Sequence, residues 1–218
     1  MYKQLNGFRE ITRNIKVEQY QVKFTTLRSL ILPNGNAAIK EMKKLSRMES
    51  IVTSSLPIKC LIVVYSYHHN NTARIAQTFS GVLNAQIKTP DQVAQEEIQQ
   101  YDLIGFGSGI DSGKHYGPIL DFVDRIPKVN NQRCFIFSTS AIQGVAKVEK
   151  DHSLLRDKLT SKGFIIVDEF SCKGFNTNSF LKYFGGMNKG RPNSEDLMHA
   201  EAFAFGMAQK GIPYGTSS

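Results

Sequence analysis

Short apolar runs alternate with amphipathic stretches along the chain from residue 58 onward. The runs are rich in Val, Ile, Leu and Phe, which is typical of strands buried on both faces of a parallel sheet. The stretches between them carry apolar residues at the spacing of helices with one buried face. The predicted strands span residues 60–65, 85–87, 102–106 and 133–137, and a fifth begins with residues 164–167. The predicted helices span residues 72–82, 93–98, 116–126, 148–161 and 194–209.

This order of elements predicts an α/β fold, namely a doubly wound five-stranded parallel sheet with helices on both faces. We expect the sheet and its helices to form one domain over residues 58–210. Residues 1–57 show no clean periodicity and are expected to be a basic N-terminal extension. Residues 172–193 are rich in Gly, Asn and aromatic residues and predict a long loop. Residues 211–218 are expected to be a loose C-terminal tail.

The positive charge is concentrated in the N-terminal part of the chain. The net charge is +8, and residues 1–58 hold six Lys and four Arg against four acidic residues, which gives +6. Such a segment favours an anionic partner or surface, and a simple solvated extension is the alternative. No apolar run approaches the length of a membrane span, and the first ten residues lack the apolar core of a signal peptide. We therefore expect a cytoplasmic protein with no transmembrane segment.

Three cysteines are present, Cys60, Cys134 and Cys172, and no two of them form a CxxC pair. Cys60 and Cys134 lie in or beside apolar strand-like runs. This placement favours small core residues in a reducing compartment, with metal binding or disulfides as alternatives.

A polar loop joins the first predicted strand to the first predicted helix. A helix N-terminus offers free N–H groups and the positive end of the helix dipole, so this loop is a candidate phosphate site. It contains neither the GxxxxGK[ST] nor the GxGxxG pattern. The two adjacent histidines have no third metal ligand at a suitable spacing, so we expect them to contribute N–H groups and partial positive charge. The candidate residues are Ser66, His68, His69, Asn70, Asn71 and Thr72.

The loops after the third and fourth strands are the next candidates, because ligands of doubly wound sheets bind at the carboxyl ends of the strands. In residues 108–116, glycines allow a flat ligand to approach the backbone, and Tyr116 or His115 can stack on an aromatic ring. Lys114 can balance an anionic ligand. The second loop offers Ser138, Thr139, Ser140 and Ala141, whose backbone groups can bind the edge of a planar heterocycle. Taken alone, either loop is also compatible with an ordinary βα turn.

Three segments in this order resemble the flavodoxin family. They are SYHHNNT at residues 66–72, GSGIDSGKH at 107–115, and CKGF at 172–175 followed by GGMNKGRP at 185–192. The family's phosphate loop runs Ser/Thr-x-Thr-Gly-Asn-Thr; here its start and its Asn-Thr end match, but two histidines replace the Thr-Gly core. The chain has no Trp to stack on a flavin, and Phe175, Tyr183 or Phe184 could substitute. The domain is slightly basic, whereas typical flavodoxins are strongly acidic.

The resemblance implies flavin mononucleotide (FMN) as the cofactor, with no catalytic side chain and no metal. The implied phosphate contacts are the six residues of the first loop named above. The implied contacts to the isoalloxazine ring come from the other two loops: Ser108, Gly109, Ile110, Gly113, His115, Tyr116, Ser138, Thr139, Ser140 and Ala141.

The resemblance favours an FMN-binding electron-transfer protein that works with redox partner proteins and not with nucleic acid. One alternative is an FMN-dependent NAD(P)H:quinone-type oxidoreductase, in which the long loop at residues 172–193 covers a substrate. A second alternative is a flavodoxin-fold binding module that has lost its flavin, for which the altered phosphate loop is the support.

Overall fold

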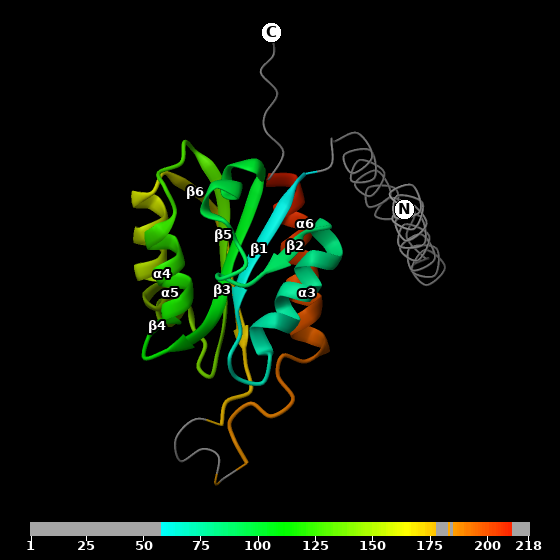
Figure 1. Ribbon diagram of the computed structural model, residues 1–218. Helices are drawn as coiled ribbons and strands as arrows, with labels where there is room; N and C mark the ends of the chain where they lie inside the picture. Colours follow the sequence, from blue (N-terminus) through cyan, green and yellow to red (C-terminus); the bar gives the residue numbers. More distant parts are fainter. Residues whose placement is uncertain (1–57, 178–182, 184, 211–218) are drawn as a thin grey trace, which may run out of the picture. The chain divides into compact units, whose positions relative to one another are not determined.

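The structure is a computed structural model, which describes residues 58–177, 183 and 185–210 (Figure 1). The expected N-terminal extension at residues 1–57, the tail at 211–218 and Phe184 lie outside these described residues.

A parallel sheet forms the centre of the described domain (Figure 1). Its strand order is β2-β1-β3-β5-β6, and every neighbouring pair in this order is parallel. A two-residue strand, β4, pairs antiparallel with the end of β3. The prediction of a doubly wound five-stranded parallel sheet is confirmed. The strands are β1 (Cys60–Tyr65), β2 (Gln86–Lys88), β3 (Leu103–Asp111), β4 (Lys114–His115), β5 (Gln132–Ser140) and β6 (Phe164–Lys173).

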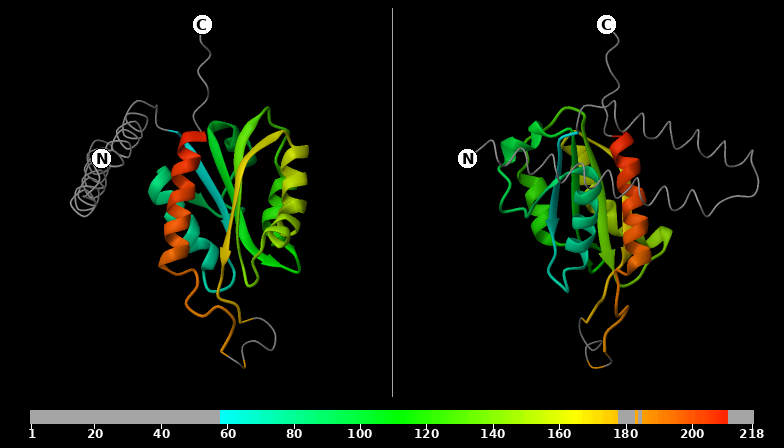
Figure 2. Two further views of the ribbon diagram at one scale, coloured as in Figure 1. Left: turned by 180° about the vertical axis from the view of Figure 1, so that it is seen from behind. Right: turned by 90° about the vertical axis from the view of Figure 1, so that its right-hand side faces the viewer.

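Helices cover both faces of the sheet. α3 (Asn71–Leu83) and α6 (Ser194–Lys210) pack on one face, and α4 (Gly117–Arg125) and α5 (Val145–Ser161) on the other. The view from behind shows the same separation of the two helix pairs (Figure 2). The short helix predicted at residues 93–98 is a 3-10 helix, η1 (Gln95–Gln100).

Side chains alternate between the two faces of the sheet along each strand, so the apolar residues form two layers, one on each face. Leu61 and Val63 of β1 belong to the layer under α4 and α5, whereas Ile62 and Val64 belong to the layer under α3 and α6. In the second layer the ring of Phe79 lies 5.2–5.6 Å from the rings of four other phenylalanines, from β5, β6 and α6. The expectation that Cys60 and Cys134 are core residues is confirmed, because both are buried. Burial raises the pKa of the Cys60 thiol to about 12, so this thiol stays neutral.

The strands β3, β5 and β6 extend further than their apolar runs indicate. β3 continues through a segment expected to be a loop and reaches Asp111, and β5 continues to Ser140. The extended ends of β3 and β5 pair with each other through their backbones, as in the pairs Ser108↔Ser138 and Gly109↔Thr139. Beyond Asp111 the chain reverses at Ser112 and Gly113, which both have positive φ, as in a type I′ hairpin turn. The glycine and hydroxyl residues of these extensions give no apolar signal, which is why the prediction ended the strands early.

The last helix begins with a reciprocal cap. Asn193 Oδ1 accepts from the N–H of Asp196 at 3.1 Å, and Asp196 Oδ2 accepts from the N–H of Asn193 at 2.8 Å. This arrangement satisfies two backbone donors that the helix itself leaves free. It fixes where the chain returns to the sheet after the long segment that follows β6.

Candidate functional site

A pocket lies at the carboxyl ends of β1, β3, β5 and β6, at the lower edge of the sheet in Figure 1. This is where ligands of doubly wound sheets bind. Its walls come from the loop after β1, the end of β3, the residues around the end of β5 and the start of the segment after β6. The lining residues are Ser66, Tyr67, His68, Asn71, Thr72, Gly109, Ile110, Tyr116, Thr139, Ser140, Ala141, Gly174, Phe175 and Asn176.

The N-terminus of α3 forms the anion-binding part of the pocket. Its N-cap, Asn70, has the left-handed φ of 52° and makes no capping side-chain hydrogen bond, and the first turn holds no acidic residue. Ser66 Oγ accepts from the N–H of Ala73 at 3.2 Å, so its own proton remains available for a ligand. The Ser66 hydroxyl and the positive end of the α3 helix dipole together suit a phosphate.

The two histidines of this loop, His68 and His69, contact different parts of the site. His68 lines the pocket. His69 is directed toward the segment after β6, where its Nε2 lies 2.8 Å from Thr177 Oγ1 and its ring lies 4.4 Å from the ring of Phe175. His69 therefore fastens the loop to the rest of the site. In the part of the chain that the structure describes, no group of three or more His, Cys, Asp or Glu side chains could hold a metal ion.

Tyr116 and Gly109 form an aromatic wall. A Cβ at position 109 would lie 2.6 Å from Tyr116 Cε2, so only glycine lets the phenol ring lie against the backbone of β3. The ring of Tyr65 meets the Tyr116 ring edge-on, with centroids 5.8 Å apart. Burial, together with Asp111, raises the pKa of Tyr116, which keeps the phenol neutral. A flat ligand can contact such a rigid aromatic surface.

The residues around the end of β5 form the opposite wall. Thr139 Oγ1 lies 2.7 Å from Thr72 Oγ1, which joins this wall to the start of α3. The carbonyl of Ser140 accepts from the N–H of Gly174 at 2.9 Å, and the carbonyl of Ala141 accepts from Asn188 Nδ2 at 2.7 Å. These bonds hold the wall in place from the side of β6.

Gly174 and Asn176 line the pocket but were not predicted as site residues, and Phe175 was predicted only as a stacking residue. Asn71 Nδ2 donates to the carbonyl of Phe175 at 2.8 Å, which ties the phosphate loop to this segment. A Cβ at position 174 would lie 2.9 Å from Asn71 Nδ2 and 3.2 Å from Thr139 Cβ, so glycine is required where the three walls meet. The only sequence signal for this role is the CKGF motif. Tyr67, which also lines the pocket, was missed as well.

Several predicted site residues lie behind the pocket wall. Ser108, His115 and Ser138 are at most 1% exposed. Ser108 Oγ lies 2.9 Å from His115 Nδ1 and accepts from the N–H of Tyr116 at 3.1 Å. A buried ring cannot stack on a bound flavin, so of the two stacking candidates, His115 and Tyr116, the structure brings only Tyr116 to the pocket. Gly113 supplies the hairpin turn, and Asn70 supplies the N-cap.

The strand order defines a doubly wound α/β protein, and the pocket lies at the sheet edge where ligands of this class bind. The sequence model of the flavodoxin domain family matches residues 62–186. The chain belongs to this family.

One relative is an uncharacterized protein of the archaeon Methanocaldococcus jannaschii. It is 48% identical over 147 residues, which cover 67% of this chain and 96% of that protein. The similarity therefore spans nearly all of the relative and leaves a third of this chain unmatched.

Solved flavodoxins share the fold. Oxidised flavodoxin 2 from Bacillus cereus has a TM-score of 0.53 and 18% identity, covering 70% of this chain and 99% of its own. A flavodoxin from the domain Archaea has a TM-score of 0.52 and 17% identity, covering 71% of this chain and 99% of its own. Within the described residues, no helix is both long and apolar enough to span a bilayer.

Proposed function

We propose that the protein binds FMN in this pocket and transfers electrons between redox partner proteins. The observation that carries the proposal is the combination, in one pocket, of an acid-free helix N-terminus and a glycine-backed aromatic wall. The first suits a phosphate, and the second suits a flat ring system. Family membership supports the same cofactor.

In this proposal the flavin supplies the redox chemistry, and the chain binds and orients it. Ser66 and the first N–H groups of α3 hold the phosphate. Tyr116 and the backbone around Gly109 contact the ring, and the backbone around Ser140 bonds to its polar edge. Binding and orienting the flavin requires no nucleophilic side chain in the pocket. Buried neutral thiols are consistent with a cytoplasmic carrier.

An FMN-dependent oxidoreductase of the NAD(P)H:quinone type is the second candidate. It is favoured by the segment after β6, because Phe175 and Asn176 line the pocket and belong to a long connection that could cover a substrate. A carrier needs the flavin edge to be accessible to a partner protein, whereas a substrate-turning enzyme needs room for NAD(P)H beside the flavin.

Fluorescence titration tests the proposal. Adding the protein to FMN should quench flavin fluorescence with a 1:1 endpoint, and the loaded protein should then be reduced by light in the presence of a sacrificial donor. A protein that leaves FMN fluorescence unchanged would refute both flavin-dependent functions. Steady oxidation of NAD(P)H with a soluble quinone would identify the enzyme instead of the carrier.

A further inference from the structure

Two side-chain amides hold the loop that joins β5 to α5, residues 141–144. Asn188, in the segment after β6, donates from Nδ2 to the carbonyl of Ala141 at 2.7 Å. Gln143, in the loop itself, donates from Nε2 to the carbonyl of Cys172 in β6 at 2.8 Å. A carbonyl oxygen can only accept, so these contacts determine which end of each amide carries the protons. The loop is therefore fastened to β6 and to the segment after it by bonds of known direction.

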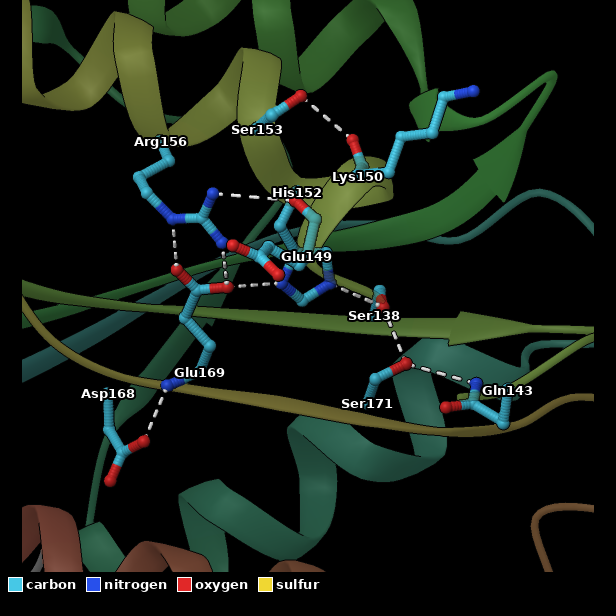
Figure 3. A network of polar contacts seen from close by, with 10 residues as sticks. All are labelled: Ser138, Gln143, Glu149, Lys150, His152, Ser153, Arg156, Asp168, Glu169 and Ser171. Atoms are coloured by element: carbon cyan, nitrogen blue, oxygen red, sulfur yellow. Dashed lines mark hydrogen bonds and ion pairs between the residues drawn. The ribbon is translucent and has the colours of Figure 1, made fainter. Parts of the chain in front are cut away.

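Gln143 also binds the last residue of β5, Ser140. Its Nε2 donates to Ser140 Oγ at 2.8 Å, and Ser140 Oγ donates to the carbonyl of Ile142 at 2.7 Å. The one proton of this hydroxyl goes to a carbonyl, so the hydroxyl oxygen is the acceptor for Gln143. A further contact of 3.0 Å joins Gln143 Nε2 to Ser171 Oγ of β6 (Figure 3). Gln143 thus connects the end of β5, the loop and β6.

The carbonyls at the end of β5 and in the first half of the loop are all engaged. The carbonyl of Ser140 accepts from the N–H of Gly174 at 2.9 Å. The carbonyls of Ala141 and Ile142 accept from the side chains of Asn188 and Ser140. In contrast, among the described residues, the N–H groups at positions 141, 142 and 143 have no hydrogen-bond partner. The loop therefore offers free donors, whereas each of these carbonyls already accepts a hydrogen bond.

Ala141 brings a free donor to the pocket. It lines the pocket together with Thr139 and Ser140. A backbone N–H that a ligand covers without supplying an acceptor costs free energy, because the N–H loses its hydrogen bond to water. A ligand acceptor at this place would satisfy the N–H, whereas a ligand donor would meet only carbonyls that already accept. This wall, formed by the end of β5 and the loop, is called the β5 wall below.

The segment after β6 holds Asn188 in place. Asn176 and Met187 exchange two backbone hydrogen bonds, of 2.9 and 2.8 Å, which bring the chain back toward the pocket just before Asn188. The carbonyl of Asn188 accepts from the N–H of Arg191 at 3.0 Å, and Arg191 Nη1 binds Asp196 of α6 at 2.7 Å. Asn188 has a φ of 58°, in the left-handed region that asparagine adopts more readily than most residues. Its amide is thus fixed by contacts on both sides in the chain.

We propose that Asn188 and Gln143 are positioning residues that determine the specificity of the β5 wall. Directly or through Ser140, they occupy the carbonyls of the loop and leave its N–H groups for the ligand. The wall then selects a planar heterocycle whose edge carries hydrogen-bond acceptors, such as the ring carbonyl oxygens of a flavin. The inference rests on the proposed function, since it concerns how the flavin ring is recognised. Neither Asn188 nor Gln143 lines the pocket, so both act through the loop.

Amide hydrogen exchange tests the free donors before any flavin is added. In the apoprotein the N–H groups of Ala141 and Ile142 should exchange freely, whereas that of Gly174, which is bonded to Ser140, should be protected. Adding FMN should protect Ala141. Protection of Ala141 and Ile142 in the apoprotein would overturn the inference whether or not FMN binds, as would bound FMN that leaves Ala141 exchanging freely. Free exchange in the apoprotein with no binding of FMN would refute the proposed function instead.

The specificity is tested with 2-thio-FMN and 4-thio-FMN, in which sulfur, a weaker acceptor, replaces one ring carbonyl oxygen. At least one analogue should bind the wild type about fivefold or more weakly than FMN, because it loses a hydrogen bond to the β5 wall. In Asn188→Gly this difference should fall to within about twofold, because the carbonyl of Ala141 is no longer occupied. Glycine tolerates the φ of 58°, so the substitution removes the amide without straining the backbone.

Two results would overturn the inference: no difference between the analogues and FMN in the wild type, or an unchanged difference in Asn188→Gly. An unchanged difference with all affinities weakened alike would show that Asn188 only stabilises the fold. Asn131→Gly is the matched control, because Asn131 has a similar φ of 53° but lies just before β5, at the opposite edge of the sheet. It should leave every affinity unchanged.

Gln143→Met is the second variant. It keeps the length of the side chain and removes both donors, so it should reduce the difference between FMN and its thio analogues in the same way as Asn188→Gly. If Asn188→Gly does not fold, Gln143→Met decides alone, and an unchanged difference in that variant would overturn the inference.

Discussion

Asn70 and Asn84 close the two ends of α3 in the same left-handed conformation, with φ of 52° and 51°. Both are exposed, but only Asn70 lies at the helix end where we place the phosphate. Replacing Asn70 with Asp adds a negative charge there with almost no change of shape. We expect at least about tenfold weaker FMN binding and unchanged riboflavin binding, because only FMN carries the phosphate. Fluorescence titration with both ligands measures this.

The matched control is Asn84→Asp, which adds the same charge at the far end of the same helix. It should leave both affinities within about twofold, since a solvated charge so far from the site is screened. If Asn70→Asp weakened FMN and riboflavin equally, the phosphate would not lie at this helix end.

Gly174 lies where three walls of the pocket meet. In Gly174→Ala the new Cβ would lie 2.9 Å from Asn71 Nδ2, so the phosphate loop or the segment after β6 must shift. We expect the free energy of unfolding to fall by about 1–3 kcal/mol and FMN binding to weaken. Urea denaturation and FMN titration measure the two effects.

At Gly81 the same change to alanine is expected to stabilise the protein instead of destabilising it. Gly81 lies within α3, and a Cβ there would meet nothing within 4 Å. Gly81→Ala should stabilise the protein by roughly 0.5–1 kcal/mol, because alanine has the higher helix propensity. Equal effects of the two substitutions would show that Gly174 is not sterically required.

At the scale of elements, Glu169 links β6 to α5 through His152 and Arg156. Its pKa is lowered from 4.5 to about 2, so it contributes stability that is present above pH 4.5 and is lost as the pH falls toward 2. Between pH 6 and pH 3 the stability advantage of the wild type over Glu169→Gln should shrink by about 2 kcal/mol. Urea denaturation at a series of pH values measures the difference.

Glu201→Gln, the same change on α6, is the control for this series and should reproduce the pH dependence of the wild type. A constant difference between the wild type and Glu169→Gln across this range would contradict the ionised, hydrogen-bonded carboxylate.

The elements differ in how far the sequence predicts them. Apolar runs locate β1 and the cores of β3 and β5 because burial on both faces leaves a continuous signal. The ends of β3, β5 and β6 are not predictable in this way, because backbone pairing between polar and glycine residues has no compositional signature. The bulge in β6, where its register with β5 shifts between Cys134 and Phe135, also has no signature in the sequence. His152 does give a signal that was not used, since a histidine in register with Leu155 and Leu159 lies on a buried helix face.

The residues of the site also differ in how far the sequence predicts them. The α3 loop was predicted because a polar loop between a strand and a helix indicates an anion site, and most of its residues line the pocket. The contribution of Gly174 depends on a contact with Asn71, more than one hundred residues earlier. Periodicity along the chain carries no information about such long-range contacts. His115 was assigned to the ligand by its neighbours in sequence, but its place in the short strand β4 turns its ring into the protein.

At the scale of the whole domain, the layer under α3 and α6 is organised around Phe79. Its ring is fully buried among aromatic rings from β5, β6 and α6. Phe79→Ala should lower the free energy of unfolding by about 3–5 kcal/mol, because it removes both buried apolar area and packing contacts. Ile142→Ala, at a side chain that is 59% exposed, should change it by less than about 0.5 kcal/mol. Similar losses in the two variants would contradict this description of the core.

The central claim is that the pocket recognises a flavin by its phosphate as well as by its ring. The most direct test is the ratio of the Kd for riboflavin to the Kd for FMN in the wild-type protein. Several hydrogen bonds from the α3 N-terminus to a phosphate predict at least about 100-fold tighter binding of FMN, since charge-assisted hydrogen bonds contribute roughly 1.5–3 kcal/mol each. Equal affinities for the two ligands, or no binding of either, would contradict the account.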